Sequence, residues 1–174
     1  MAETKSDTPS HSGINVVYAE PRLIPSFHKA LNSVASERVY LDMTEAAPLE
    51  AVTQFQTSLI DAGAAVYYAV QNEEVVGWCD IFPKSNPRQS HRGGLGMGII
   101  ASHRGQGLGR KLMDACLKKA KESGLEKVEL YVYTSNKNAV ALYEKVGFER
   151  EGLIKNYRKL DGVYFDCLAM GKFL

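Results

Sequence analysis

The chain has 174 residues, of which 45% are hydrophobic, and its 21 basic and 20 acidic residues leave a formal net charge of +1. This length and composition suit one globular domain with a substantial core, and the balanced charge argues against a polyanion such as nucleic acid as a partner. No apolar stretch reaches the roughly 18 residues of a membrane-spanning helix, and the N-terminus lacks the basic start and apolar block of a secretory signal. We therefore expect a cytoplasmic protein with no nucleic-acid and no membrane partner.

Residues 1–12 are polar and have no periodic pattern, so we expect a disordered tail that precedes a single domain over residues 13–174. Within that domain, stretches with strand periodicity and stretches with helix periodicity follow one another, which is typical of a mixed α/β protein. The predicted elements are, in chain order, a strand over 14–19, a helix after Pro21, a helix from about Pro48 to Gly63, a hairpin of strands 64–70 and 75–82, a strand over 95–101, a helix from about Leu108 to Gly124, a strand over 127–133, a helix from about Asn136 to Gly147, and a last strand after the turn Asp161-Gly162.

The second strand of the hairpin, VVGWCDIF, is apolar on both faces, which predicts a central strand covered by helices on both sides. Asp80 is the exception in this strand, because a buried carboxylate needs a partner or a raised pKa. A structural and a functional role for Asp80 are both open. The polar loop 83–92 that follows contains His91 and is long enough to shape a site.

A glycine-rich turn, RGQGLG at residues 104–109, leads from an apolar strand directly into a helix. Its three glycines allow a tight bend, so that several backbone amides can converge on one phosphate group at the positive end of the helix dipole. Arg104 and Arg110 add positive charge on both sides of the turn. The turn therefore predicts an anion-binding site.

Other readings of this turn fit less well. A Walker loop needs a Gly-Lys-Ser/Thr ending, whereas this turn ends Gly109-Arg110-Lys111 and has no hydroxyl to hold magnesium. A dinucleotide fingerprint needs G-x-G-x-x-G, whereas the spacing in this turn is G-x-G-x-G. Glu129 does lie at about the right distance downstream for a contact with a ribose. A helix start that merely needs flexible residues would explain one or two glycines, not three with flanking arginines.

Two segments carry a resemblance to a known family. Residues 104–109 resemble the R/Q-x-x-G-x-G/A pyrophosphate loop of the GCN5-related N-acetyltransferase (GNAT) superfamily, and residues 136–148, NKNAVALYEKVGF, resemble its N-x-x-A-x-x-LY-x-x-x-GF segment. The order and spacing of the two motifs also fit, and the resemblance spans most of residues 14–174. The features VVGWCDI, LGMG and DG-x-Y-x-D-x-L-x-M look like those of the bacterial amino-acid and phosphinothricin-type acetyltransferases.

The resemblance implies the GNAT fold, a mixed, largely antiparallel central sheet of about six to seven strands with helices on both faces, splayed between the strand after Gly94 and the strand 127–133. It also implies an N-acetyltransferase that moves acetyl from acetyl-CoA directly to a primary amine, without a metal. The residues expected to hold acetyl-CoA are Met97, Gly98, Ile99, Arg104, Gly105, Gln106, Gly107, Leu108, Gly109, Arg110, Asn136 and Tyr143.

The resemblance assigns Tyr143 as the acid that protonates the departing thiolate, a role that a phenol protonated at neutral pH can fill. The general base does not carry over, because the position that holds a glutamate in ribosomal-protein alanine acetyltransferases is Tyr131 here. The candidates from this sequence are, in order, Glu129, His91 and Asp80.

The expected acceptor is a small-molecule amine such as an amino acid. A protein N-terminal acetyltransferase and a non-catalytic acyl-CoA-binding module are the alternatives, and a dinucleotide-binding oxidoreductase is a weaker one. The oligomeric state is open, with a homodimer as one outcome.

Overall fold

The computed structural model describes residues 13–174, so the predicted tail over residues 1–12 lies outside the described part of the chain. The described residues form a seven-stranded sheet in the order β1-β2-β3-β4-β5-β7-β6. The strands are β1 (Asn15–Tyr18), β2 (Ala65–Gln71), β3 (Glu74–Pro83), β4 (Arg92–Ile99), β5 (Lys127–Tyr133), β6 (Glu149–Leu160) and β7 (Val163–Phe173); the helices are α1 (Ile24–Ser36), α2 (Leu49–Asp61), α3 (Leu108–Glu122) and α4 (Lys137–Val146); and the short 3₁₀ turns are η1 (Pro21–Leu23), η2 (Pro87–Gln89) and η3 (Ala101–His103).

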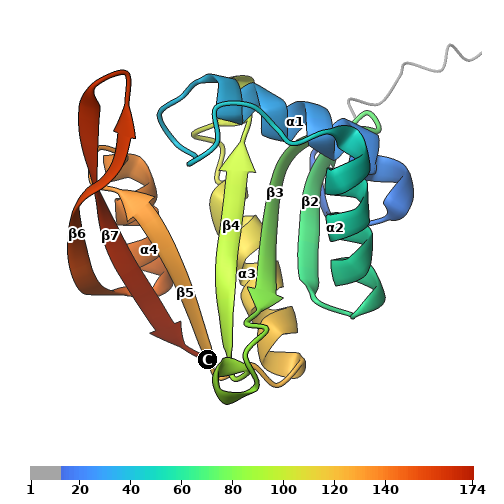
Figure 1. Cartoon of the computed structure of the whole chain (residues 1–174). Coiled ribbons are helices and arrows are strands. Elements are labelled where there is room, and N and C mark those ends of the chain that lie inside the picture. Colours follow the sequence, from blue (N-terminus) through green and yellow to red (C-terminus); the bar gives the residue numbers. More distant parts are fainter. Residues whose placement is uncertain (1–12) are drawn as a thin grey trace, which may run out of the picture.

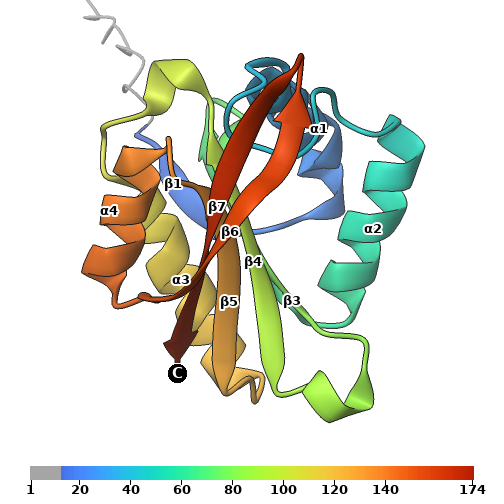
Figure 2. The same cartoon turned by 60° about the vertical axis from the view of Figure 1, so that its left-hand side comes forward.

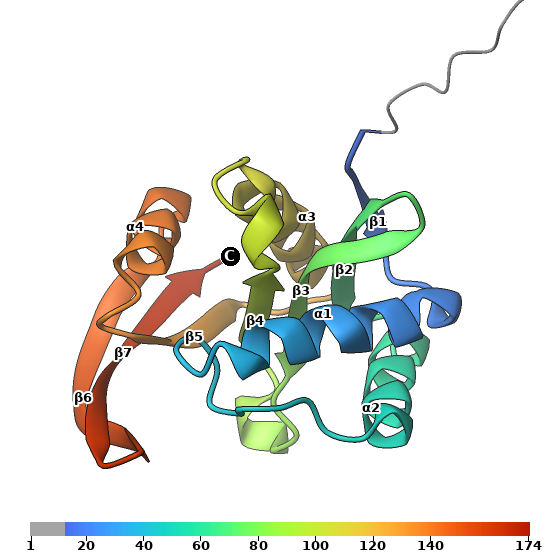
Figure 3. The same cartoon turned by 90° about the horizontal axis from the view of Figure 1, so that it is seen from above.

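The helices cover both faces of the sheet, with α1 and α2 on one face and α3 and α4 on the other (Figure 1, Figure 3). Each face has its own cluster of buried apolar side chains. Successive residues of β3 supply both clusters, because Trp78 packs toward α1 and α2 whereas Cys79 packs toward α3. The predicted fold class, and β3 as a central strand between two helical layers, are confirmed.

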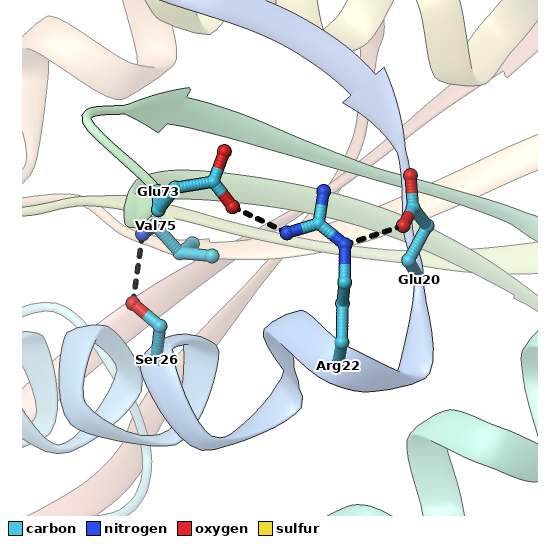
Figure 4. A network of polar contacts seen from close by, with 5 residues as sticks. All are labelled: Glu20, Arg22, Ser26, Glu73 and Val75. Atoms are coloured by element: carbon cyan, nitrogen blue, oxygen red, sulfur yellow. Dashed lines mark hydrogen bonds and ion pairs between the residues drawn. The ribbon is translucent and has the colours of Figure 1, made fainter.

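A polar network on the surface attaches the start of α1 to the β2–β3 hairpin (Figure 4). Arg22 pairs with Glu20 at 2.7 Å and also with Glu73 of the hairpin turn, and the Val75 N–H donates to the Ser26 hydroxyl at 2.8 Å. The ion pairs are exposed and therefore add little stability, whereas the hydrogen bond to Ser26 is partly buried. The network thus links the first turn of α1 to the hairpin, whereas the buried apolar side chains of α1 hold the helix on the sheet.

The sheet separates into two halves along the seam between β4 and β5, its one parallel pair (Figure 1). These strands are paired only over the three positions from Arg92 opposite Lys127 to Gly94 opposite Glu129. Beyond that point β4 stays paired with β3, and β5 stays paired with β7. Among residues 13–174, no strand therefore pairs with the facing backbone edges of the two strands beyond that point, as the expected splay requires.

Two elements differ from the sequence-based expectation. The strand β6 had no prediction of its own, because most of its residues are exposed and its sequence lacks apolar alternation; its pairing with β7 defines it. The strand β4 begins at Arg92 rather than near residue 95, since its first residues pair with Pro83 and Phe82 of β3. The loop before it is shorter accordingly.

The segment between α1 and α2 crosses the open end of the seam and touches the tip of the β6–β7 hairpin (Figure 2). Arg38 forms an ion pair with Asp161, its carbonyl accepts a hydrogen bond from Arg158, and Asp42 accepts one from the Tyr133 hydroxyl. Tertiary contacts therefore define this segment, which has no regular structure of its own. None of the helices in residues 13–174 is long and apolar enough to cross a membrane.

Candidate active site

A cleft of about 660 Å³ occupies the place where β4 and β5 separate. Its walls come from β4, from the turn that opens α3, from the end of β5, from α4 and from the segment after α1. The lining residues are Val34, Tyr40, Leu41, Leu95, Gly96, Met97, Gly98, Ile99, Arg104, Gly105, Gly107, Leu108, Gly109, Arg110, Tyr131, Val132, Asn136, Asn138, Ala139, Leu142 and Tyr143. The cleft thus brings the glycine turn and the residues 136–143 to one place, although they are far apart in the chain.

The glycine turn has the geometry of an anion site. Gly105 and Gly107 have φ angles of 74° and 76°, which L side chains adopt only with strain, and the space beside both residues is open. Gly107 is the N-cap of α3 and provides no side-chain cap, so the first amides of the helix remain available to a ligand. Gly109 serves packing instead, because a Cβ there would lie 2.8 Å from a methyl group of Leu142 on α4.

The two arginines of the turn have different surroundings. Arg104 donates to the Ile99 carbonyl at 2.9 Å and to the Glu37 carboxylate at 2.8 Å, and its guanidinium lies 4.6 Å from the centre of the Tyr40 ring. It therefore ties the end of α1 to the end of β4. Arg110 is exposed and pairs with Asp114 one helical turn later. Gln106, also expected to hold the ligand, is exposed and donates to the Ser102 carbonyl at 3.4 Å.

The backbone of β4 presents amides to the cleft. The Ile100 N–H donates to the Val76 carbonyl at 3.0 Å, which shows which residues of β4 point their N–H groups toward β3. Because hydrogen-bonded and non-hydrogen-bonded pairs alternate in an antiparallel ladder, Gly98 points its N–H at β3, whereas Met97 and Ile99 point theirs toward the separated β5. A ligand lying in the cleft can bond to this free strand edge as an added strand would.

Tyr143 and Asn136 enter the cleft from α4. Tyr143 is 7% exposed, and its hydroxyl has no hydrogen-bond partner among residues 13–174. Burial, together with the nearby Cys79, raises the pKa of Tyr143 above its usual value, so the phenol stays protonated. Asn136 caps α4 by accepting a hydrogen bond from the Ala139 N–H at 3.3 Å, which leaves its amide group free to donate to a ligand.

Glu129, first in the sequence-based order of bases, lies at the closed end of the seam. Its carboxylate accepts a hydrogen bond from Arg92 at 2.6 Å and lies 3.4 Å from the Lys127 ammonium. Burial alone would raise the pKa of Glu129, but Arg92 and Lys127 outweigh that effect and hold it below its usual value. Glu129 does not line the cleft, and two cations already neutralise it.

The other two candidate bases are separated by the fold. His91 is exposed at the start of β4, where its carbonyl accepts hydrogen bonds from the N–H groups of Glu126 and Lys127, and it does not line the cleft. Asp80 is buried on β3 beside Gly96, a residue of the cleft wall. Burial raises the pKa of Asp80 to about 6 against the opposing effect of hydrogen bonds from Gln56 and the Gly96 backbone.

Sequence reasoning missed the contribution of the segment after α1. Tyr40 and Leu41 line the cleft, and Glu37 holds Arg104 in place. No periodicity or motif marks this segment, since its position depends on contacts with β5, β6 and the glycine turn. Sequence patterns alone offered no signal for these residues.

The cleft combines three features: the anion-binding glycine turn at one end, the edge of β4 with its backbone amides, and the Tyr143 hydroxyl, which has no hydrogen-bond partner within residues 13–174. Such a cleft suits an extended ligand with a phosphate-bearing end and a chain of amide groups, held so that a reacting atom lies near a proton donor. No protein side chain competes for the Tyr143 hydroxyl among the residues described.

Comparisons with known proteins agree with this geometry. The model of the Acetyltransferase (GNAT) family matches residues 30–148. The L-amino acid N-acetyltransferase AaaT of Escherichia coli (strain K12) is 30% identical over 100 residues, which cover 57% of this chain but only 62% of that protein. The phosphinothricin acetyltransferase of Sinorhizobium meliloti, solved in complex with AcCoA, has the same fold, with a TM-score of 0.85 and 16% identity over 92% of this chain and 88% of that one.

A further solved structure extends the match to almost the whole chain. The GNAT-family acetyltransferase of Streptococcus pneumoniae superimposes with a TM-score of 0.87 and 26% identity, covering 93% of this chain and all of that one. Residues of both motifs, 104–109 and 136–148, line the cleft that the splayed sheet creates. Because the family model covers more than half of the sequence and the fold agrees throughout, this chain belongs to the GNAT acetyltransferase family.

Proposed function

We propose that the protein is an acetyl-CoA-dependent N-acetyltransferase that transfers acetyl directly to the primary amine of a small molecule. The observation that carries this proposal is the single cleft in which the glycine turn, the free edge of β4 and the Tyr143 hydroxyl meet. Membership of the GNAT family and the AcCoA complex of a protein with the same fold support it. The near-neutral charge agrees with a small acceptor rather than a charged macromolecule.

The residues of the cleft fit acetyl-CoA. The diphosphate would lie against the amides at the uncapped start of α3, where Gly105 and Gly107 leave the space open. The amide groups of the pantetheine arm would pair with the backbone of Met97 and Ile99, and Asn136 would donate from the opposite wall. When bound, acetyl-CoA supplies an acetyl group activated as a thioester.

The chain's own groups then act on the transfer. The Met97 N–H faces the opening two residues farther from the glycine turn than Ile99, where it can donate to the thioester carbonyl oxygen, on which negative charge develops. The Tyr143 hydroxyl stays protonated and donates its proton to the departing sulfur as the C–N bond forms and the C–S bond breaks. Apolar walls such as Leu142 and Val132 limit the access of water to the reacting atoms.

The test combines binding and turnover on the full chain. Calorimetry with acetyl-CoA should show binding, and a mixture of amino acids, amino-acid amides, polyamines and short peptides should cause release of free thiol with formation of an acetylated amine, identified by mass spectrometry. Absence of acetyl-CoA binding would overturn the proposal. Binding without thiol release from any amine class would instead identify a non-catalytic acyl-CoA-binding module, and release with protein N-termini alone would replace the small-molecule acceptor.

A further inference from the structure

A second cavity, of about 330 Å³, lies on the other side of β4, between the sheet and the helices α1 and α2. We call it the α1–α2 chamber. Most of the residues that line it are apolar. Two of these residues, Met43 and Phe55, are large hydrophobic residues that are 44% and 49% exposed. The lining residues are Phe27, Leu31, Leu41, Met43, Ala47, Ala51, Val52, Phe55, Gln56, Trp78, Asp80, Gly96 and Met97.

The chamber is continuous with the wall of the cleft. Leu41, Gly96 and Met97 line both cavities, so the chamber and the cleft adjoin at these residues. A molecule that fills the chamber therefore ends beside the Met97 amide, which faces the cleft. Figure 3 shows α1 and α2 on one face of the sheet and α3 and α4 on the other. Because residues of α1 and α2 line the chamber, it lies on the face opposite α3 and α4.

Asp80 is the one ionisable residue in the chamber wall, all of which lies in the described part of the chain. The glycines of β4 determine its position: a Cβ on Gly96 would lie 2.8 Å from the Asp80 carboxylate, and one on Gly98 would lie 2.3 Å from the Trp78 ring. These glycines thus let the side chains of β3 extend across β4. The carboxylate of Asp80 is thereby placed at the junction between chamber and cleft.

The partners of Asp80 leave its charge uncompensated. Gln56 donates to the Asp80 carboxylate at 3.1 Å and accepts a hydrogen bond from the Tyr68 hydroxyl at 2.9 Å. The titratable groups near Asp80 are Tyr68 on β2 and Cys79 beside it on β3, and burial raises the pKa of both, so both are neutral. Asp80 takes part in none of the ion pairs within residues 13–174. A cation that entered the chamber would therefore meet an unpaired carboxylate.

We propose that the acetyl acceptor is a primary amine with an uncharged apolar substituent, that this substituent occupies the α1–α2 chamber, and that Asp80 holds the amine nitrogen and takes its proton. This inference rests on the proposed function and specifies its acceptor. An apolar substituent is favoured because a polar one would lose its hydration against walls such as Leu31, Val52 and Trp78. A second negative charge there would also be repelled by Asp80.

The proton balance of the step is complete. The ammonium gives one proton to Asp80, which passes it to solvent, and the free amine forms the C–N bond as the C–S bond breaks. The nitrogen loses its second proton to solvent as the amide forms, and Tyr143 regains from solvent the proton that it delivers to the sulfur. The products are an amide, a thiol and one proton released to solvent.

The first test measures kcat/KM with amides of amino acids, which share one amine and differ in the side chain. Leucinamide and methioninamide should exceed serinamide and the α-amide of aspartic acid by about 10- to 100-fold, the range for an apolar pocket. Ala51→Phe, which adds a ring at the chamber, should remove most of this preference and leave the acetyl-CoA Kd unchanged. Gln54→Phe, an exposed position of the same helix outside the chamber, is the matched control and should behave as wild type.

The second test separates a catalytic from a structural Asp80. The wild-type pH profile of kcat/KM should have an acidic limb near pH 6, because burial raises the pKa of Asp80 to about 6 and the ionised form accepts the proton. Asp80→Asn, which keeps the shape of the side chain, should lower kcat/KM by about 10²- to 10⁴-fold and remove this limb. A merely structural Asp80 would change stability and leave the limb in place.

The outcomes distinguish the two proposals. Equal kcat/KM values across the amides, or a selectivity that Ala51→Phe does not alter, would overturn the chamber inference while acetyl-CoA binding and thiol release leave the proposed function standing. An acidic limb retained in Asp80→Asn would remove Asp80 as the base. A wild-type protein that does not bind acetyl-CoA would overturn the proposed function and this inference together.

Discussion

Where β4 and β5 are still paired, the Glu129 carboxylate lies between Arg92 and Lys127; where the strands have separated, the Asp80 carboxylate is held by amide groups and faces an apolar chamber. The pKa of Glu129 is held below its usual value, whereas that of Asp80 is raised to about 6. The first carboxylate is a poor proton acceptor because two cations stabilise its charge. The Asp80 carboxylate lies beside the cleft wall and has no cationic partner within residues 13–174, so the ammonium group of a substrate can pair with it.

The same contrast holds for other polar groups along the seam. At the closed end Lys127 bridges Glu129 and Glu151, and Arg92 also pairs with Glu129, so these four charges have protein partners. At the open end the Tyr143 hydroxyl and the amides of Met97 and Ile99 face the cleft and have no partner within residues 13–174. Polar groups that pair with one another stabilise the fold, whereas polar groups that have no protein partner are available to bind a ligand.

The largest effect is expected at the open end, from Tyr143→Phe. Removal of the hydroxyl should lower kcat by about 10²- to 10⁴-fold, because a positioned proton donor is lost. The acetyl-CoA Kd and the thermal stability should stay close to wild type, since the hydroxyl has no protein partner among residues 13–174. Steady-state kinetics, calorimetry and a melting curve check this. Tyr67→Phe on β2, outside both cavities, is the control, and a near-wild-type kcat in Tyr143→Phe would show that solvent protonates the sulfur.

The second largest effect is expected from Gly107→Val, which tests whether the glycine turn binds the diphosphate. A branched side chain at a φ of 76° should distort the turn and weaken acetyl-CoA binding by at least about 10²-fold. The matched control is Gly124→Val at the other end of α3, where φ is 88° and the space is equally open, so that the backbone strain is similar but no ligand is near. Calorimetry of both variants decides the matter. Equal affinities would mean that the turn does not bind the diphosphate.

Glu129→Gln tests the closed end, where we expect a loss of stability rather than of activity. The free energy of unfolding should fall by about 1 to 3 kcal/mol, since charge-assisted hydrogen bonds to Arg92 and Lys127 are lost. Because the folded-state pKa of Glu129 lies below its ordinary value of 4.5, this stabilisation is present above that pH and is lost as the pH falls through the folded-state pKa. Denaturant unfolding at several pH values measures it.

The control for the closed end is Glu126→Gln, an exposed carboxylate that forms no ion pair within residues 13–174. The acidic limb of the kcat/KM profile should be the same in Glu129→Gln as in wild type. A shift of the acidic limb to another pH in Glu129→Gln would instead support Glu129 as the general base, as the sequence-based order of candidates has it.

The smallest effect is expected from Gly96→Ala. Its Cβ would lie 2.8 Å from the Asp80 carboxylate, so the side chain must shift, at a net cost of about 1 kcal/mol after the gain from a less flexible unfolded chain. Gly152→Ala on β6, where no atom lies within 4 Å of the added carbon, should be neutral or slightly stabilising. Thermal melting compares the pair, and equal melting temperatures would show that Asp80 is free to move.

The sequence by itself determined the elements that depend on local chemistry. The glycine turn at residues 104–109 and the strand and helix periodicities were readable because backbone conformation and burial pattern act over a few residues. The order of two motifs then indicated the family, and with it the largely antiparallel sheet, its splay and the fold class, which the structure confirmed.

Only the tertiary structure decided which polar groups face the cleft. Glu129 and Asp80 look alike as carboxylates on strands, but Glu129 meets Arg92, 37 positions away, and Asp80 lies beside Gly96 through strand register. In the sequence the LGMG segment carries only part of the family resemblance, and it is the structure that shows its glycines Gly96 and Gly98 making room for side chains of β3. Long-range pairing sets these contacts, and no local pattern encodes the partner of a charge or the shape of a cavity between layers.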